Sequence, residues 1–281
     1  MRALRRDRHG ARATDDPRNG TATKSIQEAV AAAVVPPVKI HIPALDRLAE
    51  VIAPLQPALE RLDAMMPANW RGARLDYSDM IVLMKEGIPL VWVPPADVIR
   101  QLLAADDAAA RAQVVDDCRP AILSSCKVTL AAVTDTQFSE QTALLEECVH
   151  MAEHGMFNGA QALAANVWDT LVRGLAYANP GWLQNGQRLS YTKVLENIPA
   201  VEDDNATIRQ LREAAAFLPF PRALEPFWAP APVPETFNRH ATAHAAAATQ
   251  YTPVNAVTGI MLAVSVLRDI DDMGYRVQLH A

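Results

Sequence analysis

One stretch near the C-terminus restricts the fold more than any other part of the sequence. Residues 254–270 are apolar on nearly every side when they are drawn as a helix, and Thr252 and Pro253 directly before them are a helix-start signal. A helix that is apolar all round has to be buried, because no side of it is suited to water. We therefore expect a central buried helix here, surrounded by other parts of the chain.

The composition predicts that the surrounding elements are helices too. Alanine is abundant, glycine is scarce with 11 residues in 281, and aromatic residues make up only 6%. Half of the residues are hydrophobic, so the chain can bury a sizeable core in one large helical domain or in two subdomains. The predicted fold class is all-α, a helical bundle, with the Ala-rich and Arg-rich composition of a high-GC bacterial source.

The distribution of charged and apolar residues along the sequence divides the chain into three parts. Residues 1–24 are predicted to be a disordered basic tail, and residues 25–133 a helical N-terminal region to which no role can be given. Residues 134–281 form a second helical region. It begins with two amphipathic segments, 136–155 and 160–175, that predict a helical hairpin.

A Pro-rich segment, residues 219–234, follows in the second helical region and is expected to be extended. It leads directly into a short polar segment that carries the candidate site residues.

Charge and cysteine content limit the function classes. The net charge is −6, and since the first 25 residues carry about +4, the remaining chain is at about −10. This argues against a generally basic nucleic-acid-binding surface but allows a local basic site. The cysteines Cys118, Cys126 and Cys148 form no paired framework, and no run of 18 apolar residues occurs. The basic tail lacks the apolar core of a signal peptide, so we expect a cytoplasmic protein without a membrane partner.

The segment from Asn238 to His244 carries the residue types that phosphodiester chemistry needs. Arg239 can hold a phosphate with its fork of donors, and His244 can move a proton near neutral pH. His240 lies four residues before His244, on the same face of a helix. Asn238 could orient the phosphate or cap the helix.

These residues also have a purely structural interpretation. An arginine and a histidine at a helix start can bond a carboxylate of the same bundle, and Glu146, Glu147 and Asp169 are available for that. The sequence leaves both interpretations open.

The segment Arg239–His244 resembles the R-x4-6-H signature of the HEPN superfamily, with His240 as the polar residue that often follows the arginine. The resemblance covers residues 136–274, and the residues before it have no counterpart. It implies a bundle of four or five helices and a homodimer whose two motifs face each other in one cleft. Many members are metal-independent ribonucleases of toxin–antitoxin or antiviral systems, whereas others have lost catalysis and only bind or pair.

The resemblance therefore implies a catalytic set of Arg239, His244, His240 and Asn238. These residues would cut RNA to a product with a 2′,3′-cyclic phosphate, without a cofactor or a metal. The resemblance also implies a protein partner such as an antitoxin. The competing hypothesis is a catalytically silent helical protein that mediates dimerisation or partner binding. The acidic body favours that hypothesis slightly, because a ribonuclease gains affinity from basic surface.

The sequence contains two other groups of residues with side chains that can bind metal ions. Cys148, His150 and His154 share a helix, but no second pair of ligands completes a zinc site, and His154 is expected at the negative end of its helix. The acidic clusters at residues 202–204 and 269–272 are expected to be solvated surface acids.

Overall fold

The structure is a computed structural model of the chain, and it describes residues 53–198, 207–228 and 230–279. The chain divides into residues 1–56 and a compact unit of residues 57–281. The disordered tail predicted for residues 1–24 and the start of the helical region predicted from residue 25 lie outside the described residues.

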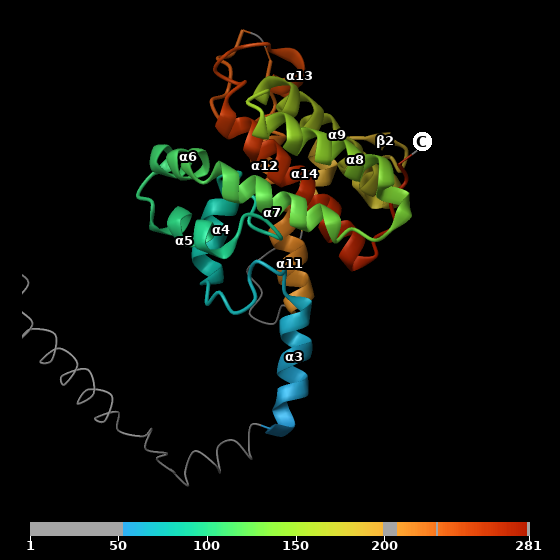
Figure 1. The fold of residues 1–281 in the computed structure, drawn as a ribbon. Coiled ribbons are helices and arrows are strands. Elements are labelled where there is room, and N and C mark those ends of the chain that lie inside the picture. Colours follow the sequence, from blue (N-terminus) through green and yellow to red (C-terminus); the bar gives the residue numbers. More distant parts are fainter. Residues whose placement is uncertain (1–52, 199–206, 229, 280–281) are drawn as a thin grey trace, which may run out of the picture. The chain divides into compact units, whose positions relative to one another are not determined.

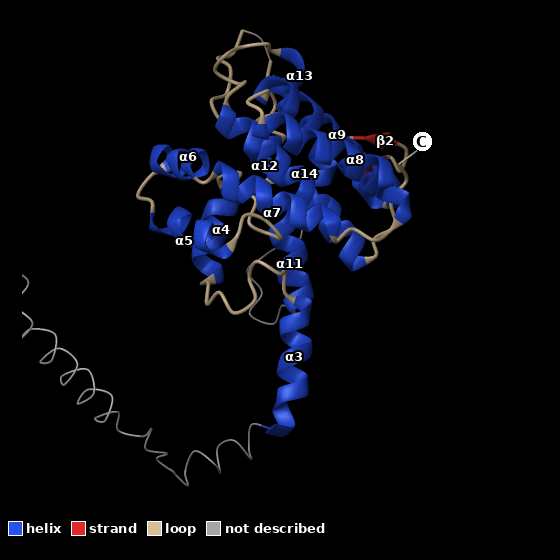
Figure 2. Cartoon of the chain, viewed as in Figure 1, coloured by secondary structure: helices blue, strands red, loops and turns tan. Residues whose placement is uncertain are grey.

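Helices dominate the described residues, as the composition predicted (Figure 1 and Figure 2). In chain order they are η1 (Ala53–Leu55), α3 (Gln56–Met65), α4 (Tyr77–Lys85), α5 (Ala96–Ala104), α6 (Ala108–Asp117), α7 (Arg119–Ala131), η2 (Thr136–Phe138), α8 (Ser139–Glu153), α9 (Phe157–Ala178), η3 (Pro180–Trp182), α10 (Tyr191–Glu196), α11 (Ile208–Phe217), α12 (Phe220–Ala223), α13 (Arg239–His244) and α14 (Pro253–Met273). The strands β1 (Leu183–Gln184) and β2 (Arg188–Leu189) pair antiparallel.

The helix α14 is buried along most of its length, as its apolar pattern predicted. The Thr252 hydroxyl caps its first turn by accepting a hydrogen bond from the backbone N–H of Asn255 at 3.1 Å, and Gly274 ends it with a φ of 63°. Between these ends α14 packs along α9 and also contacts α6, α7, α8 and α11. By length and composition alone α14 could cross a membrane, but 83% of its most apolar stretch is buried inside the protein.

The predicted hairpin is formed by α8 and α9, which pack against each other (Figure 1). The chain turns between them at Gly155, whose φ of 76° is a conformation that glycine adopts without strain. The ring of Trp168 on α9 is fully buried and meets Phe220 edge to face, with 4.9 Å between the ring centroids. The hairpin thus supplies one wall of the core around α14.

The segment between α4 and α5 connects the N-terminal helices to the same core. Its residues Leu90 and Trp92 are buried, and the carbonyl oxygen of Leu90 accepts hydrogen bonds from the Asn69 amide at 2.9 Å and from the Trp70 indole at 2.7 Å. The Trp92 indole N–H donates to Asp269 on α14 at 3.2 Å. The helices α4–α7 therefore share one hydrophobic core with α8, α9 and α14.

The small hairpin of β1 and β2 was not predicted. Leu183 pairs with Leu189 across it, and the turn contains Asn185 and Gly186 with φ values of 55° and 69°. Asn-Gly is a strong signal for such turns because both residues tolerate positive φ. The flanking strands are only two residues long, too short to show an alternating pattern.

The extended conformation predicted for residues 219–234 is wrong at its start. Residues Phe220–Ala223 form the short helix α12. Pro221 fits there because a proline in the first turn of a helix costs no hydrogen bond. Burial of the Phe220 ring against Trp168 and Phe217 stabilises this turn.

A buried charge network joins α11 to the last turns of α14. Arg212 forms ion pairs with Asp269 at 2.9 Å and with Asp272 at 2.7 Å, and Arg212 and Asp269 are only 3% and 2% exposed. Burial raises the pKa of Asp269 to about 6, and the opposing charge of Arg212 limits this rise. The expectation that the acids of residues 269–272 are solvated is therefore wrong for Asp269 and for Asp271, whose side chain is also 2% exposed and pairs with Arg268 at 2.8 Å. The acidic cluster at residues 202–204 lies outside the described residues. A charge without a partner is costly in a core, and Arg212 supplies the partner.

We predict that Arg212→Met lowers the free energy of unfolding by about 3–5 kcal/mol, because it leaves the Asp269 carboxylate buried without its ion pair. Urea unfolding followed by circular dichroism measures the change. The double variant Arg212→Met/Asp269→Leu should recover part of the loss, because it removes the charge as well. Arg209→Ala, an exposed change on the same helix, is the control, and a single variant as stable as this control would contradict the prediction.

Candidate functional site on α13

The helix α13 begins at the segment that the sequence singled out. The Asn238 side-chain oxygen accepts a hydrogen bond from the backbone N–H of Ala241 at 2.8 Å, which caps the helix. Its amide nitrogen donates to the carbonyl oxygen of Glu225 at 2.8 Å, and its own backbone N–H donates to Gln250 at 3.0 Å. Asn238 is 1% exposed, so of the two predicted roles the structure shows the cap.

Buried amides fix α13 onto α9 and onto the loop before α14. The Gln161 amide on α9 donates to the Thr242 hydroxyl at 3.0 Å, and that hydroxyl donates to the Gln250 side-chain oxygen at 3.1 Å. Gln161 and Gln250 are both fully buried. Because breaking such bonds would leave buried polar groups unpaired, α13 is held in one orientation.

The Asp169 carboxylate on α9 brings three side chains of the site together. Its Oδ2 accepts hydrogen bonds from Arg239 Nη2 and from Arg173 Nε, each at 2.7 Å, and its Oδ1 accepts one from the Tyr191 hydroxyl. Arg173 Nη2 also donates to the Tyr191 hydroxyl at 2.9 Å. We call Asp169, Arg173, Tyr191, Arg239 and His240 the α13 cluster. It contains two guanidinium groups and one carboxylate.

The Arg239 side chain is fixed by its contacts with Asp169 and Tyr191. This side chain is 15% exposed, and its guanidinium carbon lies 5.8 Å from the centroid of the Tyr191 ring. Burial and the bond to Asp169 raise the pKa of Tyr191 to about 12, so the phenol stays neutral and cannot act as a base at pH 7. Asp169 is one of the three carboxylates that the sequence offered as partners, and Glu146 and Glu147 are exposed on α8.

The two histidines of α13 line a hollow of about 300 Å³ together with Tyr191 and Trp228. The His240 ring meets the Tyr191 ring edge to face at 5.3 Å, whereas His244 is exposed. Burial and the nearby charge of Arg239 lower the pKa of His240, so its imidazole is neutral at pH 7 and can accept a proton. Arg239 itself lines a separate, much smaller hollow of about 30 Å³.

The structure thus brings Arg239 and His240 together through Tyr191 and Asp169, and it places His244 on the same hollow as His240. Sequence reasoning missed Arg173, Tyr191, Gln161 and Gln250. Only Arg173 had a local signal, because it lies four residues after Asp169 on one helix and such a pair is readable from spacing. Tyr191 and Gln161 meet the site through contacts 22 and 81 positions apart in the sequence, and Gln250 bonds Thr242 eight positions away across the loop before α14.

Of the three candidate zinc ligands, Cys148 and His150 lie on α8, and His154 is the residue directly after it. Cys148 is buried, and His154 follows the last turn of α8 as predicted, with its Nδ1 2.8 Å from the carbonyl oxygen of His150. Within residues 53–198, 207–228 and 230–279, no three His, Cys, Asp or Glu side chains are grouped so that they could hold a metal ion.

Comparison of the chain with protein-family models, with curated proteins and with solved structures finds no match.

We predict that Arg239→Gln raises the pKa of His240, because it removes a positive charge that disfavours the imidazolium. An NMR titration of the imidazole Cε1–H signals measures the pKa, with the His240 signal assigned from its loss in His240→Ala. Arg100→Gln, an exposed change on α5, should leave the value unchanged. An unchanged or lower pKa in Arg239→Gln would show that Arg239 does not act on His240 as the structure implies.

Proposed function

We propose that the chain is a metal-independent endoribonuclease of the HEPN type whose active site is the α13 cluster together with His244. The observation that carries the proposal is the placement of a neutral His240 and an exposed His244 on one hollow, beside two arginines that share a single carboxylate. The proposal rests equally on the resemblance of Arg239–His244 to the R-x4-6-H signature.

The charges of the cluster support binding of a phosphodiester. Arg173 and Arg239 together carry one more positive charge than Asp169 neutralises, while the chain as a whole is at −6. This local excess attracts a phosphate to a protein that otherwise repels RNA. Asp169 takes up one nitrogen of each guanidinium among its hydrogen bonds, so donors remain for phosphate oxygens.

The two histidines support the cleavage step. His240 accepts the proton of the 2′-hydroxyl, the 2′-oxygen attacks the phosphorus, and the bond to the 5′-oxygen breaks. His244 donates a proton to that leaving 5′-oxygen, which gives a 2′,3′-cyclic phosphate and a 5′-hydroxyl end. The arginines stabilise the charge that develops on the phosphate, and Asn238 holds the helix that presents these groups.

The remaining parts of the proposal come from the resemblance alone. They are a homodimer in which two α13 helices face each other, a role as a bacterial toxin or phage-defence effector in the cytoplasm, and a protein partner such as an antitoxin.

One observation favours a second candidate, a catalytically silent helical protein that mediates dimerisation or partner binding. The Arg239 side chain is mostly buried and paired with Asp169 of its own bundle, and it lines a different hollow from His240 and His244. An arginine in this position also serves simply to join α13 to α9. In that case the cluster stabilises the fold, and the surface of α13 is a contact surface.

We predict that the purified protein cleaves single-stranded or hairpin RNA in the presence of EDTA, and that His244→Ala and His240→Ala each slow cleavage by about 10²–10⁴-fold. Arg239→Ala should slow it as well, because the developing phosphate charge loses a partner. Labelled RNA separated on denaturing gels gives the rates. A 3′-terminal phosphate that phosphatase removes only after mild acid treatment identifies the cyclic phosphate.

The matched control is His150→Ala, which removes an exposed histidine from α8. It should cleave at the wild-type rate. Wild-type protein that is inactive on every RNA, or activity that survives in all three α13 variants, would refute the nuclease proposal. A dimer in light scattering that depends on the exposed residues of α13 would then support the second candidate.

A further inference from the structure

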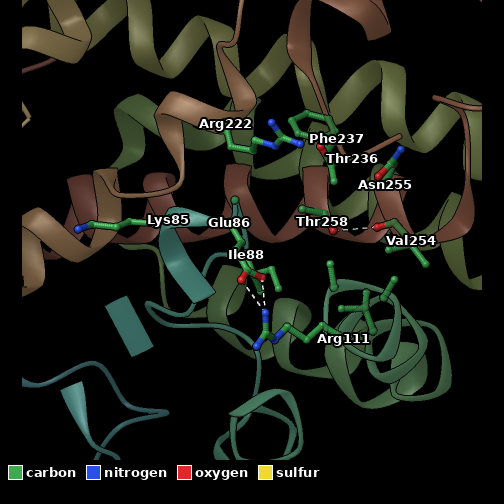
Figure 3. A pocket seen from close by; sticks show the side chains of 14 residues that line it. Lys85, Glu86, Ile88, Arg111, Arg222, Thr236, Phe237, Val254, Asn255 and Thr258 are labelled. Carbon is green, nitrogen blue, oxygen red and sulfur yellow. Dashed lines mark hydrogen bonds and ion pairs between the residues drawn. The ribbon is translucent and has the colours of Figure 1, made fainter. Parts of the chain in front are cut away.

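A second hollow lies away from the histidines, beside the first turns of α14 (Figure 3). It has a volume of about 330 Å³, and its walls come from the end of α4, from α6, from Arg222 on α12, from residues 236–237 and from α14. We call it the α4–α14 hollow. This volume is in the range of sites that hold small organic ligands.

The lining of the α4–α14 hollow is amphipathic. Ile88, Val115, Phe237 and Val254 give it apolar walls, and the Thr258 hydroxyl lies on the same side as Val254, to whose carbonyl oxygen it donates a hydrogen bond at 2.9 Å (Figure 3). Apolar walls of this kind suit an aromatic or acyl body, because its burial releases water.

The charged residues of the lining are mainly basic. The described lining contains the cations Lys85, Arg111 and Arg222 and one carboxylate, Glu86. Arg111 is committed to that carboxylate, since its Nη1 lies 2.6 and 2.7 Å from the two Glu86 oxygens (Figure 3). The Lys85 side chain points away from the others in Figure 3. Arg222 pairs with Glu225, which is not part of the lining, so its remaining donors are the ones that can reach a ligand in the hollow.

The position of Arg222 depends on a glycine. A Cβ atom at Gly87 would come within 3.0 Å of Arg222 Cγ, and the φ of Gly87 is 97°, which other residues rarely adopt. Because Gly87 has no Cβ, the aliphatic part of the Arg222 side chain can pack against the turn after α4. One Arg222 nitrogen donates to Glu225 at 2.6 Å, and an arginine has further donors for a second anion. The positive end of the α14 dipole, at Val254 and Asn255, lies on the same hollow.

From these observations we infer that the α4–α14 hollow is a binding site for a small amphipathic organic anion, with the anionic group at Arg222 and the apolar body between Phe237, Val115 and Val254. The site is independent of the proposed ribonuclease activity. Its occupant would touch residues 236–237, which lead directly into Asn238 and α13.

A matched pair of fluorescent probes tests the inference. 8-Anilinonaphthalene-1-sulfonate carries an anionic group, and N-phenyl-1-naphthylamine has the same ring system without it. We expect the sulfonate to bind the native protein at one saturable site, more tightly than the neutral probe. Arg222→Ala should weaken the sulfonate about tenfold, as expected for the loss of a charged hydrogen bond, and should leave the neutral probe within about twofold.

Two variants that fill the hollow test its location. Thr258→Phe and Ala112→Phe place a ring into it from α14 and from α6, and each should abolish binding of both probes. Arg100→Ala, an exposed change on α5, should bind like wild type. Circular dichroism and urea unfolding identify any variant that is not folded. One folded filling variant is enough to test the location of the site. Lack of saturable binding, or equal binding by wild type, Arg222→Ala and a folded filling variant, would overturn the inference.

Discussion

The packing of α14 is the constraint on which the rest of the structure depends. Its side chains from Asn255 to Ile270 are almost all buried, so every surrounding element is placed by the need to cover it. The burial of each large apolar side chain stabilises the fold by about 1.5–3 kcal/mol. The helix α9 covers one side, and α13 is attached to α9 by the Gln161 and Gln250 hydrogen bonds. These buried hydrogen bonds therefore connect the candidate site to the core below it.

The Asp169 carboxylate has two opposite effects on the candidate site. It fixes Arg239, Arg173 and Tyr191 in one arrangement, which lowers the entropy that a ligand would otherwise have to remove. It also neutralises half of the positive charge that the two arginines carry. A ribonuclease benefits from the fixed arrangement, but it is weakened by the loss of positive charge that would attract RNA. A cluster that only stabilises the fold needs no more than the ion pairs with Asp169. The geometry is thus compatible with the chemistry proposed for His240 and His244 but does not depend on it.

Much of the fold could be predicted because its signals are local. The Thr252 cap, the Asn238 cap and the turn at Gly155 each depend on residues a few positions apart, and the structure confirms all three. The helix α12 and the strands β1 and β2 were missed because each is too short for periodicity to show. The helix α12 also depends on the contact of Phe220 with Phe217. The burial of Asp269 was missed for a related reason. Its partner Arg212 lies on another helix, and nothing in the local sequence marks the pair.

The sequence by itself determined that the chain is helical, that residues 254–270 form a buried helix, and that the segment with Arg239, His240 and His244 opens a helix. Only the tertiary structure decided how these side chains are used. Arg239 meets Asp169 across 70 positions of sequence, and Gln161 meets Gln250 across 89. Helix formation depends on neighbours along the chain, whereas the charge state of His240 and the pairing of Arg239 depend on which helices pack together. The sequence identifies Arg239–His244 as the residues of a candidate site, and the fold determines their burial and their contacts.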